Sequence, residues 1–411
     1  MNKKKFVVHE NYDWINIGNN PEEISYEEFL LLKIYIENYF NNKKILEISF
    51  NKFRFYNIVG VLEINNIRIE ILPKLSLENK IDEDRKILLN ILSKCYNLPL
   101  YFLTSIKSSF DDNNFLELLG NIYLKNLQKE LSKGIYKEYT SSEVNSKFLK
   151  GRLLLKDHLK KNFLRNNLIY SKEEYLTEFN SLNILLKKTL IILLKKIDKF
   201  YLRKEILKTL EYFKNIPIES IKNVEIENII FNNKNSRFKK ILEFSNLIIS
   251  GSNFNFASGI YDSFGILFDM PKLFEKYIFI LLKELSFEYD LEINYQEKIK
   301  KLLINKNSNK AILTLTPDIV LYEDSKAKLI IDTKWKNNYT SNDIYQIHTY
   351  LTSYEDVKKG ILIYPQSLSK SENIFLETSS LNNKKEIEII YLNIFDINLT
   401  KSILRNLLIN I

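Results

Sequence analysis

Apolar and polar residues alternate along the first part of the chain in the manner of β-strands. Residues 58–64 and 67–72 form two such runs, and the pair Asn65-Asn66 joins them. Side chains alternate between the two faces of a strand, and a tight turn containing Asn is common between antiparallel strands. The pattern therefore predicts a β-hairpin here and a β-rich beginning to the chain.

The middle of the chain has apolar residues three or four positions apart, which is the spacing of helices. This spacing predicts helices over 81–96 and 115–136. Residues 181–213 form either one long helix or two stacked ones. The helical spacing is lost near residue 250, where we place the main domain boundary.

Beyond this boundary the order of elements changes. A predicted helix over 273–285 follows Asp269, which can cap it, and Pro271 lies in the first turn, where proline is tolerated. Strands and a second helix follow, an order that favours helices packed on a mixed sheet. The predicted strands are 291–295, 311–322, 328–335 and 360–364, and the second helix is 343–354.

The chain has 411 residues, too many for one compact core, and predicts roughly two to three domains at about 150 residues each. The predicted fold class is a multidomain α+β protein. Residues 1–115 would form a β-rich N-terminal domain and residues 116–250 a mainly helical, basic middle region. Residues 251–411 would form an α/β domain.

Composition and charge support a folded protein with a basic centre. Apolar residues make up 45% of the chain and charged residues 27%, which excludes wholesale disorder. The formal net charge is +9, and residues 146–240 carry 22 Lys and Arg against 10 Asp and Glu. This region could face a polyanion, or its lysines could serve only to keep exposed helix faces in water. The charge alone leaves both interpretations open.

Several features narrow the possible classes of protein. Cys95 is the only cysteine, so neither an intrachain disulfide nor a cysteine-based metal site is possible, and a cytoplasmic, reducing location is expected. The most apolar stretch, residues 182–200, is interrupted by charged residues, so we expect no membrane span. The sequence contains no G-x-x-x-x-G-K-[ST] motif, so we expect no nucleotide to bind this chain.

Two predicted strands carry acidic residues where a structural sheet would have apolar ones. Pro317-Asp318 precedes one apolar run, and Asp332 lies two residues before Lys334 at the end of another. Residues two apart on a strand share a face, and Asp318 could lie beside them on the adjacent strand. Two close carboxylates favour a divalent cation between them, Mg²⁺ or Mn²⁺ for oxygen ligands. A nearby lysine can orient the attacking water and stabilise charge on a phosphate. The alternative is a surface hairpin with a cross-strand ion pair.

The two helices of this region supply further candidates. Glu275 lies on the buried edge of its helix, where a carboxylate needs a partner, either a metal site or a Lys or Arg side chain. Gln346 and Tyr350 are four residues apart and therefore share a helix face. Both side chains can bond a phosphate or a base edge.

In this order, Glu275, Pro317-Asp318, Asp332-x-Lys334 and Gln346-xxx-Tyr350 resemble the PD-(D/E)xK nuclease superfamily in the variety with a QxxxY helix. More narrowly, the chain resembles the McrC-like nuclease subunits of McrBC-type modification-dependent restriction systems. The resemblance covers roughly residues 55–365. Its supporting segments outside the acidic motifs are 60–75, 89–96, 150–153, 180–187 and 267–277.

The resemblance implies a Mg²⁺-dependent DNA endonuclease subunit with a PD-(D/E)xK core in residues 251–411. Asp318, Asp332, the backbone carbonyl of Thr333 and Glu275 would hold the metal, Mg²⁺ or Mn²⁺. Lys334 would activate water, and Gln346 and Tyr350 would position the DNA strand.

The resemblance also implies a partner, an McrB-like AAA+ GTPase hexamer that recognises a modified base in double-stranded DNA. The N-terminal domain would dock on this partner and stimulate its GTPase. Two alternatives are a non-catalytic activator of the GTPase and a stand-alone DNA repair nuclease.

Overall fold

In the computed structural model, the chain forms two compact units. One unit combines Met1–Leu100 with Phe254–Ile411, and the other is Tyr101–Asn253. Both mix helices and strands, which confirms the α+β class. Residues 74 and 75, part of one segment that supports the resemblance, lie outside the described residues. The structure describes residues 4–40, 45–73, 81–96, 114–165, 167–217, 229–252, 263–308, 310–366, 373–378 and 384–409.

The predicted N-terminal hairpin is present, with β5 (Ile58–Ile64) paired antiparallel to β6 (Ile67–Leu72). Strand β1 (Lys4–His9) adds to β6 in parallel, and β10 (Ser263–Asp269) adds to β5 antiparallel. Strand β10 lies beyond the boundary predicted near residue 250. The predicted segments 1–115 and 251–411 therefore contribute to one sheet, a long-range pairing that no local pattern reveals.

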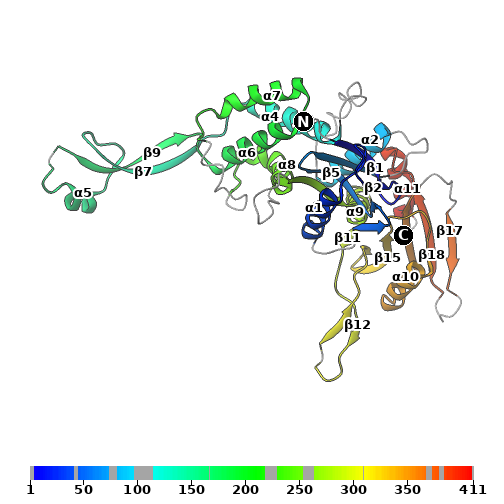
Figure 1. Cartoon of the computed structure of the whole chain (residues 1–411). Helices are drawn as coiled ribbons and strands as arrows, with labels where there is room; N and C mark the ends of the chain where they lie inside the picture. Colours follow the sequence, from blue (N-terminus) through cyan, green and yellow to red (C-terminus); the bar gives the residue numbers. More distant parts are fainter. Residues whose placement is uncertain are drawn as a thin grey trace. The chain divides into compact units, whose positions relative to one another are not determined.

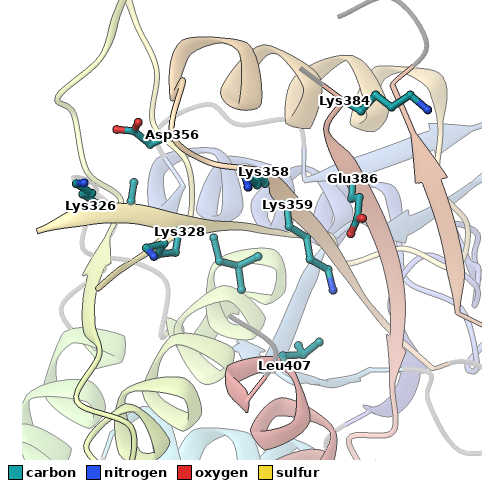
Figure 2. Close-up of a pocket in the computed structure, with 10 residues that line it drawn as sticks. Lys326, Lys328, Asp356, Lys358, Lys359, Lys384, Glu386 and Leu407 are labelled. Atoms are coloured by element: carbon teal, nitrogen blue, oxygen red, sulfur yellow. The ribbon is translucent and has the colours of Figure 1, made fainter. Parts of the chain in front are cut away.

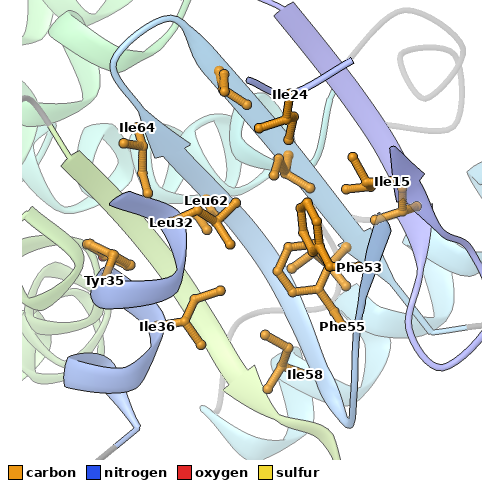
Figure 3. Packing of buried hydrophobic residues seen from close by; sticks show 14 of the residues in the cluster. Ile15, Ile24, Leu32, Tyr35, Ile36, Phe53, Phe55, Ile58, Leu62 and Ile64 are labelled. Atoms are coloured by element: carbon orange, nitrogen blue, oxygen red, sulfur yellow. The ribbon is translucent and has the colours of Figure 1, made fainter. Parts of the chain in front are cut away.

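A hydrophobic cluster fills the N-terminal part of this unit (Figure 3). Leu32 and Ile36 of α1 pack toward Leu62 of β5, and Phe53 and Phe55 of β4 lie in the same cluster. Ser25 and Glu28 form a reciprocal capping box that fixes the start of α1. The elements here are β2 (Ile15–Asn16), α1 (Tyr26–Tyr39), β3 (Leu46–Ser49), β4 (Lys52–Phe55) and α2 (Ile81–Cys95), with the strand order β2-β4-β3.

The C-terminal part of the same unit is built on a mixed sheet with the strand order β11-β14-β15-β16-β18-β17. Strand β14 is antiparallel to β15, whereas β15, β16 and β18 are parallel to one another. The elements are α9 (Met270–Ser286), β11 (Glu292–Tyr295), β12 (Lys301–Ile304), β13 (Ala311–Thr314), β14 (Ile319–Glu323), β15 (Lys326–Thr333), α10 (Ser341–Ser353), β16 (Lys359–Pro365), β17 (Ile374–Glu377), β18 (Glu386–Leu392) and α11 (Ile397–Ile409).

The predicted strand over 311–322 is wrong, because the structure has two strands there in different sheets. Strand β13 pairs with β12 in a separate hairpin, and β14 belongs to the mixed sheet. Pro317 lies between them and has no N–H to continue a ladder. The predicted strand over 328–335 likewise ends earlier, at Thr333.

The second unit contains a helical body and a long β-ribbon. The 181–213 segment forms two helices rather than one. The prediction of a mainly helical middle region misses the antiparallel pair β7–β9, which forms an extended arm (Figure 1). No helix among the described residues has the length and apolarity to cross a bilayer. The elements are α4 (Phe115–Leu131), β7 (Glu138–Ser146), β8 (Arg152–Leu153), α5 (Leu155–Asn162), β9 (Ile169–Thr177), α6 (Ser181–Lys196), α7 (Phe200–Leu210), η1 (Glu211–Phe213), η4 (Ser236–Phe238) and α8 (Lys239–Ser252).

Gly60 tests the pairing that joins the N-terminal and C-terminal segments. Its φ is +132°, and a Cβ added there would lie 2.0 Å from the carbonyl oxygen of Ile266 in β10. Gly60→Ala should cost about 3 kcal/mol or more, because backbone rather than a side chain must move. We expect a melting temperature lower by roughly 6–12 °C. Gly134→Ala is the control, since Gly134 has a φ of +101° but nothing within 4 Å of its added Cβ. A Gly60 variant as stable as this control would contradict the β5–β10 packing.

Candidate active site

The register of β14 and β15 brings the two predicted aspartates together. Ile319 is paired with Ile331, so Asp318, one residue earlier, faces Asp332. The Thr333 backbone N–H donates to Asp318 Oδ2 at 2.7 Å, and the Thr333 hydroxyl donates to the same oxygen at 2.9 Å. The sheet thus holds Asp318 against the end of β15 in one orientation.

Lys334 follows β15 and turns back to its neighbouring carboxylate. Its ammonium forms an ion pair with Asp332 Oδ2 and donates to Gln346 Oε1 at 3.0 Å. Its backbone N–H still bonds the carbonyl of Ile363 in β16 at 2.8 Å, so the position is fixed by the sheet. The structure therefore brings Asp318, Asp332 and Lys334 together, as the spacing predicts.

Helix α10 presents Gln346 and Tyr350 to this cluster. The Gln346 amide donates to Tyr350 Oη at 2.8 Å and reaches Asp332 Oδ1 at 3.4 Å. The Tyr350 hydroxyl donates to the carbonyl of Thr316, just before Asp318, at 3.1 Å. The predicted shared face is thus present, and it faces the aspartates.

Glu275 approaches the cluster from α9, where it is 8% exposed. Its Oε1 accepts a hydrogen bond from the Gln296 side chain at 2.7 Å, and the Gln296 backbone N–H bonds the carbonyl of Asp318 at 2.9 Å. Gln296 therefore ties Glu275 to the strand that carries Asp318. Sequence reasoning missed Gln296, because it follows β11 without a motif and its role arises only from the tertiary fold.

A second missed contact reaches the site from the N-terminal segment. The Trp335 indole donates to Glu10 Oε1 at 2.8 Å, and its ring packs against Phe274 at a centroid distance of 5.2 Å. Glu10 is 1% exposed, and burial raises its pKa to about 8. The residue after Lys334 is thus held by a side chain from the beginning of the chain.

Burial and mutual repulsion disfavour negative charge on these carboxyl groups. Burial, and after it the nearby Asp318 charge, raise the pKa of Asp332 to about 7 against the opposing effect of Lys334. Burial likewise raises the pKa of Asp318. For Glu275, burial and then the Asp318 charge raise the pKa to about 7. Such a cluster ionises fully only when a cation offsets the repulsion.

The donor set fits a small, hard divalent cation. Asp332 Oδ2 is buried and accepts no well-directed hydrogen bond from the described residues, although the Lys334 ammonium contacts it. No group of three or more His, Cys, Asp and Glu side chains is arranged as a metal cage in the described parts of the chain. Mg²⁺ is usually held by only one or two carboxylates and keeps several waters. The two carboxylates of Asp318 and Asp332 match this donor requirement, whereas the described residues contain no cluster of the kind that forms a zinc cage.

A separate pocket of about 470 Å³ lies at the opposite end of β15 from Asp332 (Figure 2). Its cationic side chains are largely paired: Lys328 with Glu323 at 2.8 Å, and Lys359 with Glu388 at 2.7 Å. These acids offset much of the charge, and we assign this pocket no ligand. The residues that line it are Lys326, Ala327, Lys328, Leu329, Asp356, Lys358, Lys359, Lys384, Glu386 and Leu407.

Solved structures with a similar fold include two from Thermococcus gammatolerans. One chain belongs to the refined half-complex from a tetradecameric assembly of McrB AAA+ hexamers with bound McrC. It is 17% identical, with a TM-score of 0.76 and 99% of each chain covered. Another belongs to the cryo-EM structure of the McrBC complex. It is 20% identical, with a TM-score of 0.54, covering 68% of this chain and 88% of that chain. These similarities establish a shared fold.

The comparison with curated proteins gives no match. The family described as McrBC 5-methylcytosine restriction system component, in contrast, matches residues 53–365. This range includes the segments and acidic motifs on which the resemblance to McrBC-type systems was based, and the resemblance is confirmed. Because the match covers most of the chain, the protein belongs to the family of McrBC 5-methylcytosine restriction system components.

Proposed function

We propose that this chain is the Mg²⁺-dependent DNA endonuclease subunit of an McrBC-like restriction system, with a catalytic core of the PD-(D/E)xK type. The juxtaposition of Asp318, Asp332 and Lys334 at one end of the mixed sheet carries this proposal. A family member that served only as a scaffold would have no reason to keep two adjacent, mutually repelling carboxylates, one of them fully buried.

Each side chain has a distinct part in phosphodiester hydrolysis. Asp318 and Asp332 would hold the cation together with the backbone carbonyl of Thr333, and Glu275 would support the cation or a water molecule. When bound, Mg²⁺ would polarise the scissile phosphate and make water easier to deprotonate. Lys334 would orient the attacking water and offset negative charge that develops on the phosphate.

Gln346 and Tyr350 would position the DNA strand. The Gln346 amide lies between Lys334, Asp332 and Tyr350, so a displaced amide could bond a phosphate oxygen without leaving the site. The Glu10–Trp335 hydrogen bond would keep the segment after Lys334 in place while DNA binds.

The partner in this proposal is an AAA+ GTPase hexamer of the McrB type, acting on modified double-stranded DNA. One of the Thermococcus gammatolerans structures of similar fold contains McrB AAA+ hexamers with bound McrC. This chain has no P-loop motif, so GTP hydrolysis would belong to the partner. Residues 1–115 would dock on the partner and stimulate it.

Two other functions give different results in a reconstitution. A non-catalytic activator would stimulate GTP hydrolysis without cutting DNA, whereas a stand-alone repair nuclease would cut without the partner. The acid and lysine set at the end of β15 favours catalysis over simple activation. The family match favours a multicomponent system over a stand-alone enzyme.

The purified chain with Mg²⁺ should cut DNA at least ~100-fold more slowly than the chain with its AAA+ partner and GTP, because specific protein–DNA binding is typically about 10³-fold or more tighter than non-specific binding. A formal charge of +9 without a base-reading motif cannot select a site by itself. Product formation on modified and unmodified plasmids measures both rates. Efficient cutting of unmodified DNA by the isolated chain would favour the stand-alone nuclease.

A further inference from the structure

The hairpin of β12 and β13 leaves the mixed sheet beside the candidate active site. At its base, the Gln296 backbone N–H bonds the carbonyl of Asp318 at 2.9 Å, and the Leu315 N–H bonds the carbonyl of Lys300 at 2.8 Å. Gln296 also holds Glu275, so both ends of the hairpin adjoin residues of the acidic cluster. In Figure 1 this hairpin extends away from the body of its unit.

The charged side chains of the hairpin are all positive. Residues 298–317 contain five lysines and neither Asp nor Glu. No carboxylate of the described residues forms an ion pair with any of them, and only Lys300 has an aromatic partner, the ring of Tyr354. The acid at the hairpin base, Glu297, is buried and accepts hydrogen bonds from the Tyr322 hydroxyl at 2.9 Å. The lysines are Lys298, Lys300, Lys301, Lys306 and Lys310.

The apolar residues of the hairpin are exposed. Leu303 and Leu313 are paired across the strands, and Leu302 and Ile312, their chain neighbours, are exposed as well. An isolated two-stranded hairpin is marginally stable in water, so a binding partner would add to its order. The exposed apolar side chains are Ile299, Leu302, Leu303, Ile304, Ile312 and Leu313.

We propose that the β12–β13 hairpin is a DNA-binding arm that enters the major groove next to the cleavage site. The major groove accepts a two-stranded β-ribbon, and its floor presents thymine methyl groups that aliphatic side chains can contact. The lysines contact phosphates along the groove walls, where they fix position rather than sequence. This inference rests on the proposed nuclease function and adds the element that holds the duplex.

The positive charge of the hairpin favours DNA over a second copy of this chain as its binding partner. A two-fold contact between identical hairpins would bring the same lysines together, and like charges facing each other disfavour such an interface. A polyanion instead gains from every lysine, because each neutralised phosphate releases condensed counterions.

The test combines three substitutions, Lys301→Gln, Lys306→Gln and Lys310→Gln, in the full chain. Binding of a short fluorescent duplex is measured by anisotropy without divalent cations, so cleavage plays no part. The slope of log affinity against log salt should fall by about 2–3, since each duplex phosphate contact contributes about 0.9. Affinity at low salt should fall at least ~10-fold.

The control removes three lysines from the pocket at the other end of β15: Lys326→Gln, Lys358→Gln and Lys384→Gln. This variant loses the same net charge and should keep the wild-type salt slope. Equal losses in the two variants, or an unchanged slope in the hairpin variant, would overturn the inference. If the hairpin variant keeps its DNA affinity but no longer self-associates in sedimentation, the inference is also overturned. The hairpin would then bind a second copy of the chain.

The nuclease proposal and the arm can fail separately. If the wild-type chain with its partner never cuts DNA but the hairpin variant loses DNA affinity, DNA binding by the hairpin is supported and the nuclease function is contradicted. If DNA cleavage depends on Asp332 as proposed but the hairpin variant binds DNA normally, only the proposal that the hairpin binds DNA is contradicted.

Discussion

Lys334→Met should cut DNA at least ~100-fold more slowly than wild type while still binding Mn²⁺, because a well-placed electrostatic group contributes about 10²–10³ to the rate. Lys334 forms an ion pair with Asp332, so it competes with a cation for the same carboxylate. Removing the ammonium should leave divalent affinity unchanged or higher. Calorimetric titration of Mn²⁺ in the presence of DNA, beside a cleavage assay, measures both effects.

Asp318→Asn is the variant to compare with Lys334→Met, because it should remove a cation ligand and leave the lysine in place. Its amide oxygen can still accept the two hydrogen bonds from Thr333, but the charge that attracts a cation is gone. Metal affinity and cleavage should therefore fall together. If Lys334→Met loses Mn²⁺ binding, or if Asp318→Asn retains it, the roles of the two residues are assigned wrongly.

Asp332→Asn should reduce DNA cleavage at least ~1,000-fold, because it removes a charged cation ligand at the centre of the cluster. The fold should survive. Asp332 is fully buried and its pKa is raised to about 7. The free energy of unfolding of the wild type therefore decreases as the pH rises from about 4 to 7, and the full loss is present above pH 7, where Asp332 is ionised. In metal-free buffer at pH 8 the variant should melt no lower than wild type. A much lower melting temperature would show that the loss of activity reflects misfolding.

The sequence predicted the proximity of Asp318 and Asp332 because both residues lie at strand ends. A Pro-Asp pair before one apolar run and Asp-x-Lys at the end of another require only that two strands pair antiparallel. Helical spacing then placed Gln346 and Tyr350 on one face, and the capping residue Asp269 was identified correctly. These features follow from local periodicity.

Features that depend on distant pairing were not predictable from such patterns. Strand β10 joins the sheet of β5 although about two hundred residues separate them, and Gln296 contacts Glu275 only after β11 has packed beside β14. The β7–β9 arm was missed because its strands are rich in charged and polar residues, with both faces largely in solvent. Burial normally produces the alternation that identifies a strand.

The central claim is that the cluster at the end of β15 cuts DNA while another chain hydrolyses GTP. The most direct test reconstitutes wild type and Asp332→Asn with the AAA+ GTPase that co-purifies from the native source, and follows phosphate release and DNA cleavage in the same reaction. We expect wild-type GTP hydrolysis and no DNA cleavage from Asp332→Asn. Undiminished DNA cleavage by this variant would contradict the assignment of the active site, and parallel loss of both activities in a folded variant would contradict their separation.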